Sequence, residues 1–244
     1  MNEKIAEMTV LGVIPARGGS RGIPRKNIRE LAGKPLIAHT ISEAKMSKLL
    51  DRVIVTTDDE EIATVADRYG AEIPFLRPKE LAQDDTTDLP VFQHALHWLK
   101  EHESYTPEII VHLRPTSPLR KAEHVDKAIK LLIKNPWADS VRSVSVPSQN
   151  PFKMWKIDGG FLKPLIMDSN LPEPYNAPRQ KLPNVYWQNG YVDVTRYETI
   201  MMKNSMTGDK ILPLIIDQIY PLDIDNLTGF EIAEALIKEL IKDK

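Results

Sequence analysis

Residues 8–27 decide the fold, and they read MTVLGVIPARGGSRGIPRKN. Their first half is a short apolar run, rich in β-branched residues, that ends at Pro15. Such a run is typical of a strand buried inside a parallel sheet. A loop rich in glycine and basic residues follows at once. In α/β sheets, ligands bind beyond the carboxyl ends of the strands, so this loop is the first candidate for a binding site.

Strands and helices alternate along the chain after this stretch. The apolar spacing predicts helices over residues 35–46, 60–69, 92–99, 122–134, 195–202 and 226–242, and strands over 52–57, 71–76, 108–113, 185–194 and 211–216. We therefore expect an α/β fold, with a mostly parallel sheet and helices on both faces. Residues 140–190 are rich in proline, which predicts an excursion of strands and loops within a single domain spanning 1–244.

The composition excludes several classes of protein. The 244 residues carry 32 basic and 34 acidic groups and no cysteine. A net charge of −2 argues against a nucleic-acid binder, and the absence of cysteine rules out disulfides, thiolate metal sites and a cysteine nucleophile. No apolar run approaches the roughly 18 residues of a membrane helix, and residues 1–7 have no signal-peptide core. We expect a soluble, cytoplasmic protein whose partners include neither nucleic acid nor a membrane.

Positive charge is concentrated in one segment. Residues 17–34 contain six basic residues and one acidic residue, which predicts an anionic ligand. The turn at 18–20 lets backbone N–H groups approach phosphate oxygens, and Arg17, Arg21 and Lys26 can neutralise a triphosphate. The alternative is a surface turn with solvated basic residues. The loop lacks GxxxxGK[ST] and GxGxxG, so neither a P-loop enzyme nor a dinucleotide dehydrogenase is indicated.

Asp223 and Asp225 are the candidate metal ligands. They flank Ile224 at the expected end of the last strand, where alternation places both carboxylates on one face. Hard oxygen ligands of this kind suit octahedral Mg²⁺ or Mn²⁺, with phosphate oxygens and water in the other positions. The alternative is that both carboxylates cap the helix that starts near Asn226.

Seven motifs together carry a resemblance that covers nearly the whole chain. They are IPARGGSRGIPRKN at 14–27, FLRPKELA at 75–82, PTSPLR at 115–120, NPFK at 150–153, PRQKLP at 178–183, QNG at 188–190 and DID at 223–225. Through them the sequence resembles the CMP-sialic acid synthetases, or acylneuraminate cytidylyltransferases. The resemblance implies a Rossmann-like nucleotidyltransferase fold. It also implies a homodimer that transfers CMP from CTP to the anomeric hydroxyl of a nonulosonic acid, releasing pyrophosphate and requiring Mg²⁺.

The resemblance also assigns a nucleotide site. Arg17, Arg21 and Lys26 would hold the triphosphate and, with Asp223 and Asp225, carry the catalysis. The full nucleotide site would comprise Ala16, Arg17, Gly18, Gly19, Ser20, Arg21, Lys26, Asn27, Arg77 and Thr86. Most family members have lysine where Arg21 stands, so the charge is kept while the geometry changes.

The resemblance implies an acceptor site in the second half of the chain. Arg179 matches an arginine that pairs with the sugar-acid carboxylate. Lys153 matches a lysine that reaches the neighbouring subunit's pocket, which would make residues 140–190 a dimerisation arm; the alternative is an ordinary surface hairpin. The expected acceptor site comprises Arg114, Lys153, Arg179, Trp187, Gln188, Asn189 and Asp193.

Three acceptor positions depart from the family pattern. Arg114 replaces a glutamine, Trp187 a frequent arginine, and Asp193 a frequent tyrosine. We hypothesise that Arg114 restores the charge lost at Trp187 and that Asp193 meets an added hydroxyl or amine. The acceptor would then differ from plain N-acetylneuraminate and could be a legionaminate-like or ketodeoxynonulosonate acid.

Two other functions stay open at this point. One is a nucleotidyltransferase for another sugar acid or a sugar phosphate, although the GxGxRxxP loop of the sugar-phosphate class is absent. The other is a catalytically silent nucleotide-sensing protein. Retention of Lys26, Asp223 and Asp225 argues against the silent protein.

Overall fold

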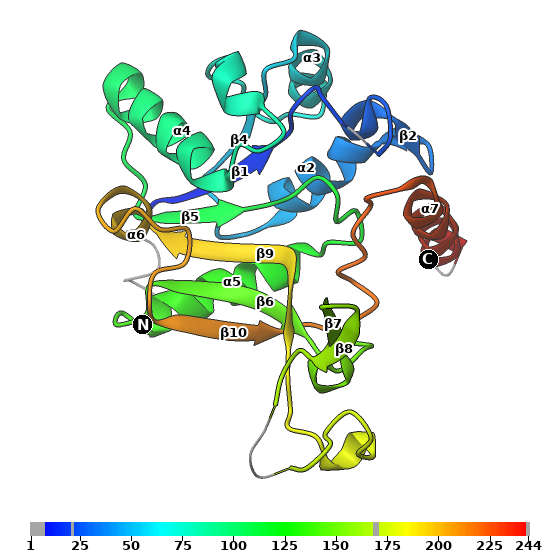
Figure 1. Cartoon of the computed structure of the whole chain (residues 1–244). Coiled ribbons are helices and arrows are strands. Elements are labelled where there is room, and N and C mark those ends of the chain that lie inside the picture. The colour runs from blue at the N-terminus through cyan, green and yellow to red at the C-terminus, as the bar shows by residue number, and fades with distance from the viewer. Residues whose placement is uncertain (1–7, 21, 168–170, 243–244) are drawn as a thin grey trace.

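The computed structural model describes residues 8–20, 22–167 and 171–242. Its centre is a six-stranded sheet of order β10-β6-β9-β5-β1-β4 (Figure 1). The strands β4, β1 and β5 are mutually parallel, β6 is parallel to β10, and β9 runs antiparallel between β5 and β6. The mostly parallel sheet is therefore confirmed. The bounds are β1 Val10–Pro15, β4 Arg52–Thr56, β5 Ile109–His112, β6 Ser140–Ser145, β9 Trp187–Arg196 and β10 Ile211–Ile215.

Helices cover both faces of this sheet. One apolar cluster joins the sheet to α2 (Leu36–Met46), α3 (Glu60–Arg68) and α5 (Ala122–Lys134). A second cluster joins the opposite face to α4 (Asp88–Glu103) and α6 (Tyr197–Met201). Apolar side chains of β1, β4 and β5 alternate between the two clusters, as expected for strands buried on two sides. No described helix is long and apolar enough to cross a membrane.

The start of α3 shows how local sequence sets an element. The Asp59 carboxylate accepts a hydrogen bond from the backbone N–H of Ile62 (2.9 Å), which caps the N-terminus of the helix. After the helix, Gly70 adopts a left-handed conformation with φ of 86°. The Asp59 cap and Gly70 thus set the two ends of α3.

Helix α7 (Leu227–Lys242), late in the sequence, packs against the loop that follows β1. It buries Phe230, Ala233 and Ile237 in a third apolar cluster that also contains Ile23 and Ile224. The amide oxygen of Asn226 accepts a hydrogen bond from the N–H of Gly229 (2.8 Å), so a neutral amide rather than an aspartate caps the helix. The cluster holds the 14–27 loop beside residues 223–225.

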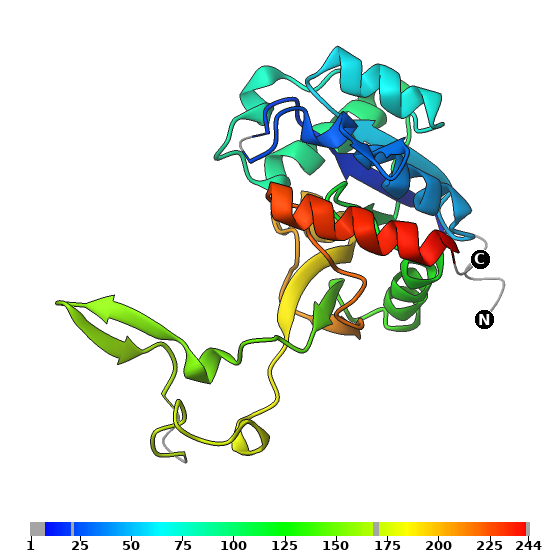
Figure 2. The ribbon, with the colours of Figure 1, turned by 90° about the vertical axis from the view of Figure 1, so that its right-hand side faces the viewer.

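Short elements complete the chain. They are the strand pairs β2 (Glu30–Leu31) with β3 (Lys34–Pro35) and β7 (Trp155–Asp158) with β8 (Phe161–Pro164), and the 3₁₀ turns η1 (Lys26–Ile28), η2 (Lys79–Ala82), η3 (Pro151–Lys153) and η4 (Arg179–Lys181). Figure 2 shows that the segment with β7, β8 and η4 extends away from the rest of the protein. We call the described residues of this segment, 146–167 and 171–186, the arm.

Two expected boundaries are wrong. Residues 71–76 form only isolated bridges, from Glu72 to Ile54 of β4 and from Leu76 to Thr57 just after β4, because Pro74 between them has no N–H to continue a ladder. The excursion predicted over 140–190 is shorter than expected. Residues 140–145 form β6, which pairs on both sides within the sheet, and residues 187–190 belong to β9.

We expect Asp139 to stabilise the fold in a pH-dependent way. Its carboxylate accepts hydrogen bonds from Lys203 Nζ (2.7 Å) and from the N–H groups of Asp209 (2.9 Å) and Lys210 (3.0 Å). The bond from Lys203, with those from the backbone, lowers the pKa of Asp139 to about 2. Because the unfolded value is near 3.9, this stabilisation is complete above about pH 4 and is lost as the pH falls toward 2.

Asp139→Asn should therefore lower the free energy of unfolding at pH 7 by about 1–2 kcal/mol, a value reduced for solvent screening around Lys203. The difference from the parent should shrink at pH 3. Urea unfolding at both pH values measures it, with the exposed neighbour exchanged as a control, Asp209→Asn. Equal stability of parent and Asp139→Asn at pH 7 would contradict the prediction.

Candidate active site

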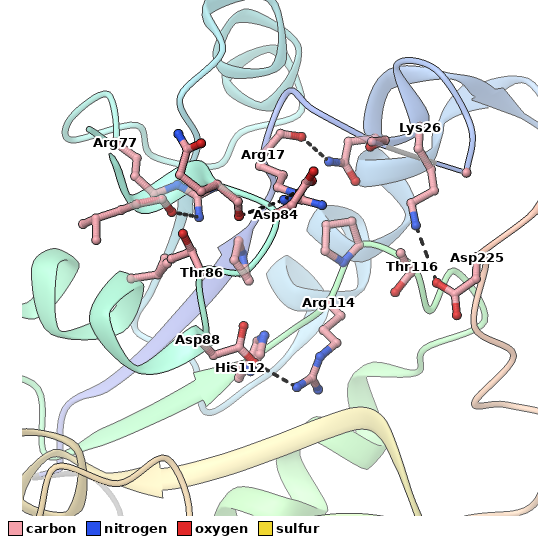
Figure 3. A pocket seen from close by; sticks show the side chains of 18 residues that line it. Arg17, Lys26, Arg77, Asp84, Thr86, Asp88, His112, Arg114, Thr116 and Asp225 are labelled. Atoms are coloured by element: carbon pink, nitrogen blue, oxygen red, sulfur yellow. Dashed lines mark hydrogen bonds and ion pairs between the residues drawn. The ribbon is translucent and has the colours of Figure 1, made fainter. Parts of the chain in front are cut away.

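A cleft of about 440 Å³ opens beyond the carboxyl ends of β1 and β5. This is the place where α/β sheets bind ligands, and the volume lies within the usual range for small-molecule sites. Figure 3 shows side chains from four distant parts of the chain facing this space. Of the predicted site residues, those that line it are Arg17, Ser20, Lys26, Asn27, Arg77, Thr86, Arg114 and Asp225.

The first loop and the last loop meet in this cleft. Lys26 Nζ donates a hydrogen bond to the carbonyl oxygen of Ile224 (2.8 Å) and lies 3.8 Å from Asp225 Oδ1. These residues are 198 positions apart in the sequence. Gly22 allows the approach, because a Cβ at that position would collide with the carbonyl oxygen of Asp225. A cation and a carboxylate therefore stand side by side where an anionic ligand and a metal could meet.

Arg17 spans the cleft to the loop before α4. Its Nη1 donates to the carbonyl oxygen of Gln83 (2.8 Å) and lies 2.9 Å from Asp84 Oδ1. The amide of Asn27 donates to the carbonyl oxygen of Arg17 (3.0 Å), which holds the backbone of the loop. A bound phosphate would compete with Asp84 for the guanidinium group.

The glycine turn faces α3 more than the cleft, contrary to expectation. The N–H of Gly18 donates to Asp58 Oδ1 (2.9 Å), and a Cβ on Gly18 would lie 2.7 Å from Asp59 Oδ2. Arg25 is hydrogen-bonded to Asp59 and Glu61. The Asp58 carboxylate, just before α3, thus occupies the Gly18 N–H that was expected to bind phosphate. Among the expected nucleotide-site residues that do not line the cleft are Ala16, Gly18 and Gly19, and Arg21 lies outside the described residues.

Arg77 offers unused hydrogen-bond donors at another edge of the cleft. Its side chain is buried, and Nη1 donates weakly to the carbonyl oxygen of Leu81 (3.4 Å). Nε and Nη2 have no hydrogen-bond partner among the described residues. Burial lowers the pKa of this guanidinium group. Buried hydrogen-bond donors without a partner in the protein are available to bind a ligand oxygen.

Asp88 and His112 line the cleft and were not predicted as site residues. Asp88 is the first residue of α4, and His112 is the last residue of β5. Their signal in the sequence is weak, because one histidine at the end of an apolar strand looks like a core residue. Position alone could have pointed to His112, since it lies at the carboxyl end of a parallel strand.

Several expected acceptor residues have structural partners instead of facing the cleft. Asn189 is buried, with its amide bonded to the hydroxyls of Ser143 (2.6 Å) and Ser145 (2.9 Å). Asp193 is 0% exposed and contacts Arg114 and Arg142, so it does not meet a ligand directly as we had expected. Trp187 and Gln188 lie exposed at the start of β9, outside the cleft lining.

Lys153 and Arg179 lie on the arm and do not line this cleft. Lys153 Nζ donates to the carbonyl oxygen of Tyr175 (3.3 Å), and Arg179 Nη2 donates to the carbonyl oxygen of Pro147 (2.9 Å). Arg179 lines a separate hollow of about 80 Å³. Within one chain, the arm and the cleft therefore form two separate sites.

The two candidate metal ligands differ in position. They do not follow the last strand directly, because β10 ends at Ile215 and residues 221–225 form an extended loop before α7. Buried Ile224 anchors this loop, so Asp223 and Asp225 both point outward. Asp225 lines the cleft with a side chain that is 77% exposed, and Asp223 does not line it. The described residues contain no cluster of three or more potential metal ligands, so a bound metal would need oxygens from substrate and water.

Comparison with known proteins places the chain in a family. A family profile described as "Cytidylyltransferase" matches residues 11–153. The CMP-N,N′-diacetyllegionaminic acid synthase of Legionella pneumophila is 34% identical over 95% of this chain and 97% of its own length. The N-acylneuraminate cytidylyltransferase of Escherichia coli is also 34% identical, over 92% of this chain and 51% of its own length.

A solved structure of CMP:2-keto-3-deoxy-manno-octonic acid synthetase in complex with CTP matches 95% of this chain and 99% of its own, with a TM-score of 0.70 and 15% identity. The likeness shows the same Rossmann-like fold. Fold and sequence together define the class as a nucleotidyltransferase. The chain belongs to the cytidylyltransferase family.

Lys26 should be essential for holding a nucleoside triphosphate. Lys26→Ala should weaken CTP binding about tenfold to a hundredfold, because a hydrogen bond to a charged group contributes roughly 1.5–3 kcal/mol. Titration calorimetry without an acceptor measures the affinity. The matched control is Lys34→Ala, an exposed lysine of β3 in the same basic segment. Equal affinities for the two variants would remove Lys26 from the site.

Proposed function

We propose that the protein transfers CMP from CTP to the anomeric hydroxyl of a nonulosonic acid and releases pyrophosphate. The observation that carries this proposal is the cleft that Lys26, Arg17, Arg77 and Asp225 share. It combines cations for a triphosphate, open donors for a nucleoside and a carboxylate for a metal. Relatives whose names state this chemistry, for legionaminic and neuraminic acids, cover nearly the whole chain.

The cleft suggests how the nucleotide lies. Lys26 and Arg17 would bind the phosphates, where their charge offsets the negative charge that develops as pyrophosphate leaves. Arg77 and Thr86 would bind the cytosine and ribose, Arg77 through Nε and Nη2, which have no hydrogen-bond partner among the described residues. Asn27, through its bond to the carbonyl oxygen of Arg17, would keep the loop in position.

Mg²⁺, or Mn²⁺ in its place, would act as the cofactor. Asp225 fits this group, because it presents an exposed carboxylate to the cleft, whereas Asp223, two residues away, does not line the cleft in a single chain. Both are hard oxygen ligands, as Mg²⁺ prefers, and substrate phosphates usually supply further ligands. When bound, the metal would polarise the α-phosphate and lower the pKa of the attacking hydroxyl.

The arm supports a homodimer. Its hairpin exposes large apolar side chains, with Ile157 78% and Phe161 75% exposed. An exposed apolar patch of this kind marks an interaction surface. A second copy that covered it would bring Lys153 and Arg179 to the neighbouring cleft. Each acceptor site would then be completed by the arm of the other chain, with Arg179 pairing with the acid's carboxylate.

A substrate screen tests the proposed function. The parent should release pyrophosphate with CTP and at least one acid among N-acetylneuraminate, N,N′-diacetyllegionaminate and ketodeoxynonulosonate. UTP, GTP and ATP should support much slower release. We expect N-acetylneuraminate to be the weaker acceptor. Release with a sugar phosphate instead would favour the other nucleotidyltransferase class, and CTP binding without any release would favour a nucleotide sensor.

Mixed dimers test the arm. Lys26→Ala and Lys153→Ala should each be nearly inactive alone at CTP concentrations near the parent's KM, because each damages every site. Unfolding and refolding the two variants together should restore about a quarter of the parent's activity, since half of the dimers are mixed and each mixed dimer has one intact site. Light scattering verifies the dimer. Activity no greater than the sum of the two variants would show that Lys153 does not serve the neighbouring site.

A further inference from the structure

A row of polar side chains crosses the sheet beside the cleft. His112 on β5 pairs in register with Asp193 on β9, and Asp193 pairs in register with Arg142 on β6. Residues paired in register point to the same face of a sheet. Arg114 follows His112 by two positions and points to the same side. This face is otherwise apolar and packs against α4, with the His112 ring 4.7 Å from the ring of Phe92.

Burial of these polar side chains has a cost in folding free energy. The side chains of His112 and Asp193 are 3% and 0% exposed. Both ring nitrogens of His112 and Oδ1 of Asp193 have no hydrogen-bond partner among the described residues. Each buried polar atom left in this state lowers the stability of the folded protein. The row therefore does not serve stability alone, and His112 has bonding capacity available to a ligand in the cleft that it lines.

His112 is a neutral group in this place. Burial, together with the positive charges of Arg114, Arg142 and Arg120, holds its pKa well below the usual range. A neutral imidazole offers one N–H donor and one nitrogen acceptor. It can therefore bind a group that both donates and accepts hydrogen bonds.

Arg114 is held between two carboxylates. Its Nη2 lies 3.2 Å from Asp88 Oδ2, its Nη1 lies 2.9 Å from Asp193 Oδ2, and Nη1 also donates to the carbonyl oxygen of Gly190 (3.1 Å). Gly190 has a φ of 64°, and a Cβ there would lie 2.7 Å from Arg114 Nη1, so a side chain at this position would be strained and would displace the guanidinium group. The guanidinium group is oriented from three sides.

The charges in this group are already matched. Asp193 contacts Arg142 Nη1 (2.6 Å) as well as Arg114, and Asp88 contacts the other end of Arg114. A ligand carboxylate would have to displace one of these buried or half-buried pairs, at a cost in desolvation. An uncharged polar group meets no such barrier. Arg114 is thus unsuited to restoring a second carboxylate contact in place of Trp187, which was our expectation.

Figure 3 places this group apart from the expected nucleotide contacts. Arg77 and the Lys26–Asp225 pair lie on opposite sides of the cleft, and Asp88, His112 and Arg114 lie along a third side. In the proposed function the first two sides are occupied by CTP. The third side is left for the acceptor.

We propose that His112, Asp88 and Arg114 select the acceptor acid by an uncharged substituent, a hydroxyl or acylamino group, and that Asp193 and Arg142 are positioning residues for Arg114. This inference rests on the proposed function and specifies which part of the acid is recognised. The substituent would occupy the free ring nitrogens of His112. Its absence from an acid would leave those nitrogens buried and unpaired, which is a strong basis for discrimination.

The test compares three exchanges at His112. His112→Phe keeps the packing on Phe92 and removes both ring nitrogens. It should raise the KM for the best acid of the screen at least tenfold, keep the Kd for CTP within about threefold, and reduce the discrimination among the three acids. His112→Gln and His112→Asn, which retain a donor and an acceptor, should recover part of the loss. The control is His97→Phe on the exposed side of α4.

The positioning residues Arg142 and Asp193 are exchanged together, because removing the charge of one would leave the charge of the other buried without its partner. Arg142→Gln combined with Asp193→Asn keeps both shapes and leaves no net charge behind. It should raise the KM for the acid while the Kd for CTP and the melting temperature change little. Arg142→Lys, which keeps the charge, should recover part of the acid affinity.

The outcomes separate this inference from the proposed function. A parent that uses none of the three acids contradicts both. An active parent whose His112→Phe variant keeps its KM and its discrimination among acids contradicts the inference alone. A variant in which CTP binding weakens as much as acid use would place His112 in the nucleotide site and also contradict the inference.

Discussion

The candidate site depends on one long-range contact, in which Lys26 donates to the carbonyl oxygen of Ile224 beside Asp225. The contact persists because Ile23 and Ile224 are buried in one apolar cluster with α7. Burial of that cluster is worth several kcal/mol, far more than an exposed ion pair. Apolar packing therefore sets the distance between the cation and the carboxylate, and the charges are left free to act on a ligand.

The fold was largely predictable from local patterns, and its exceptions have local causes. Apolar, β-branched runs marked β1, β4 and β5, whereas β6 was hidden because Arg142 and three serines interrupt its apolar residues. Those polar residues are buried by pairing across β9, which is a tertiary effect. Pro74 explains why residues 71–76 remain bridges rather than a strand.

The candidate site was predictable only where its residues cluster in sequence. Arg17 and Lys26 were identified from the basic loop, and both line the cleft. No pattern pointed to His112 or Asp88, because their association depends on strand register and on where α4 begins. The same register explains Asp193, which contacts arginines within the protein. The sequence locates the charged residues, whereas the fold determines which of them are accessible to a ligand.

The central claim is that the first and last loops act on one metal-bound triphosphate. Titration calorimetry of CTP with and without Mg²⁺, for the parent and for Asp225→Asn, tests it most directly. The account predicts that Mg²⁺ strengthens CTP binding to the parent and that this gain is largely lost in Asp225→Asn, although the variant unfolds at the same temperature. An undiminished gain in Asp225→Asn would contradict the account.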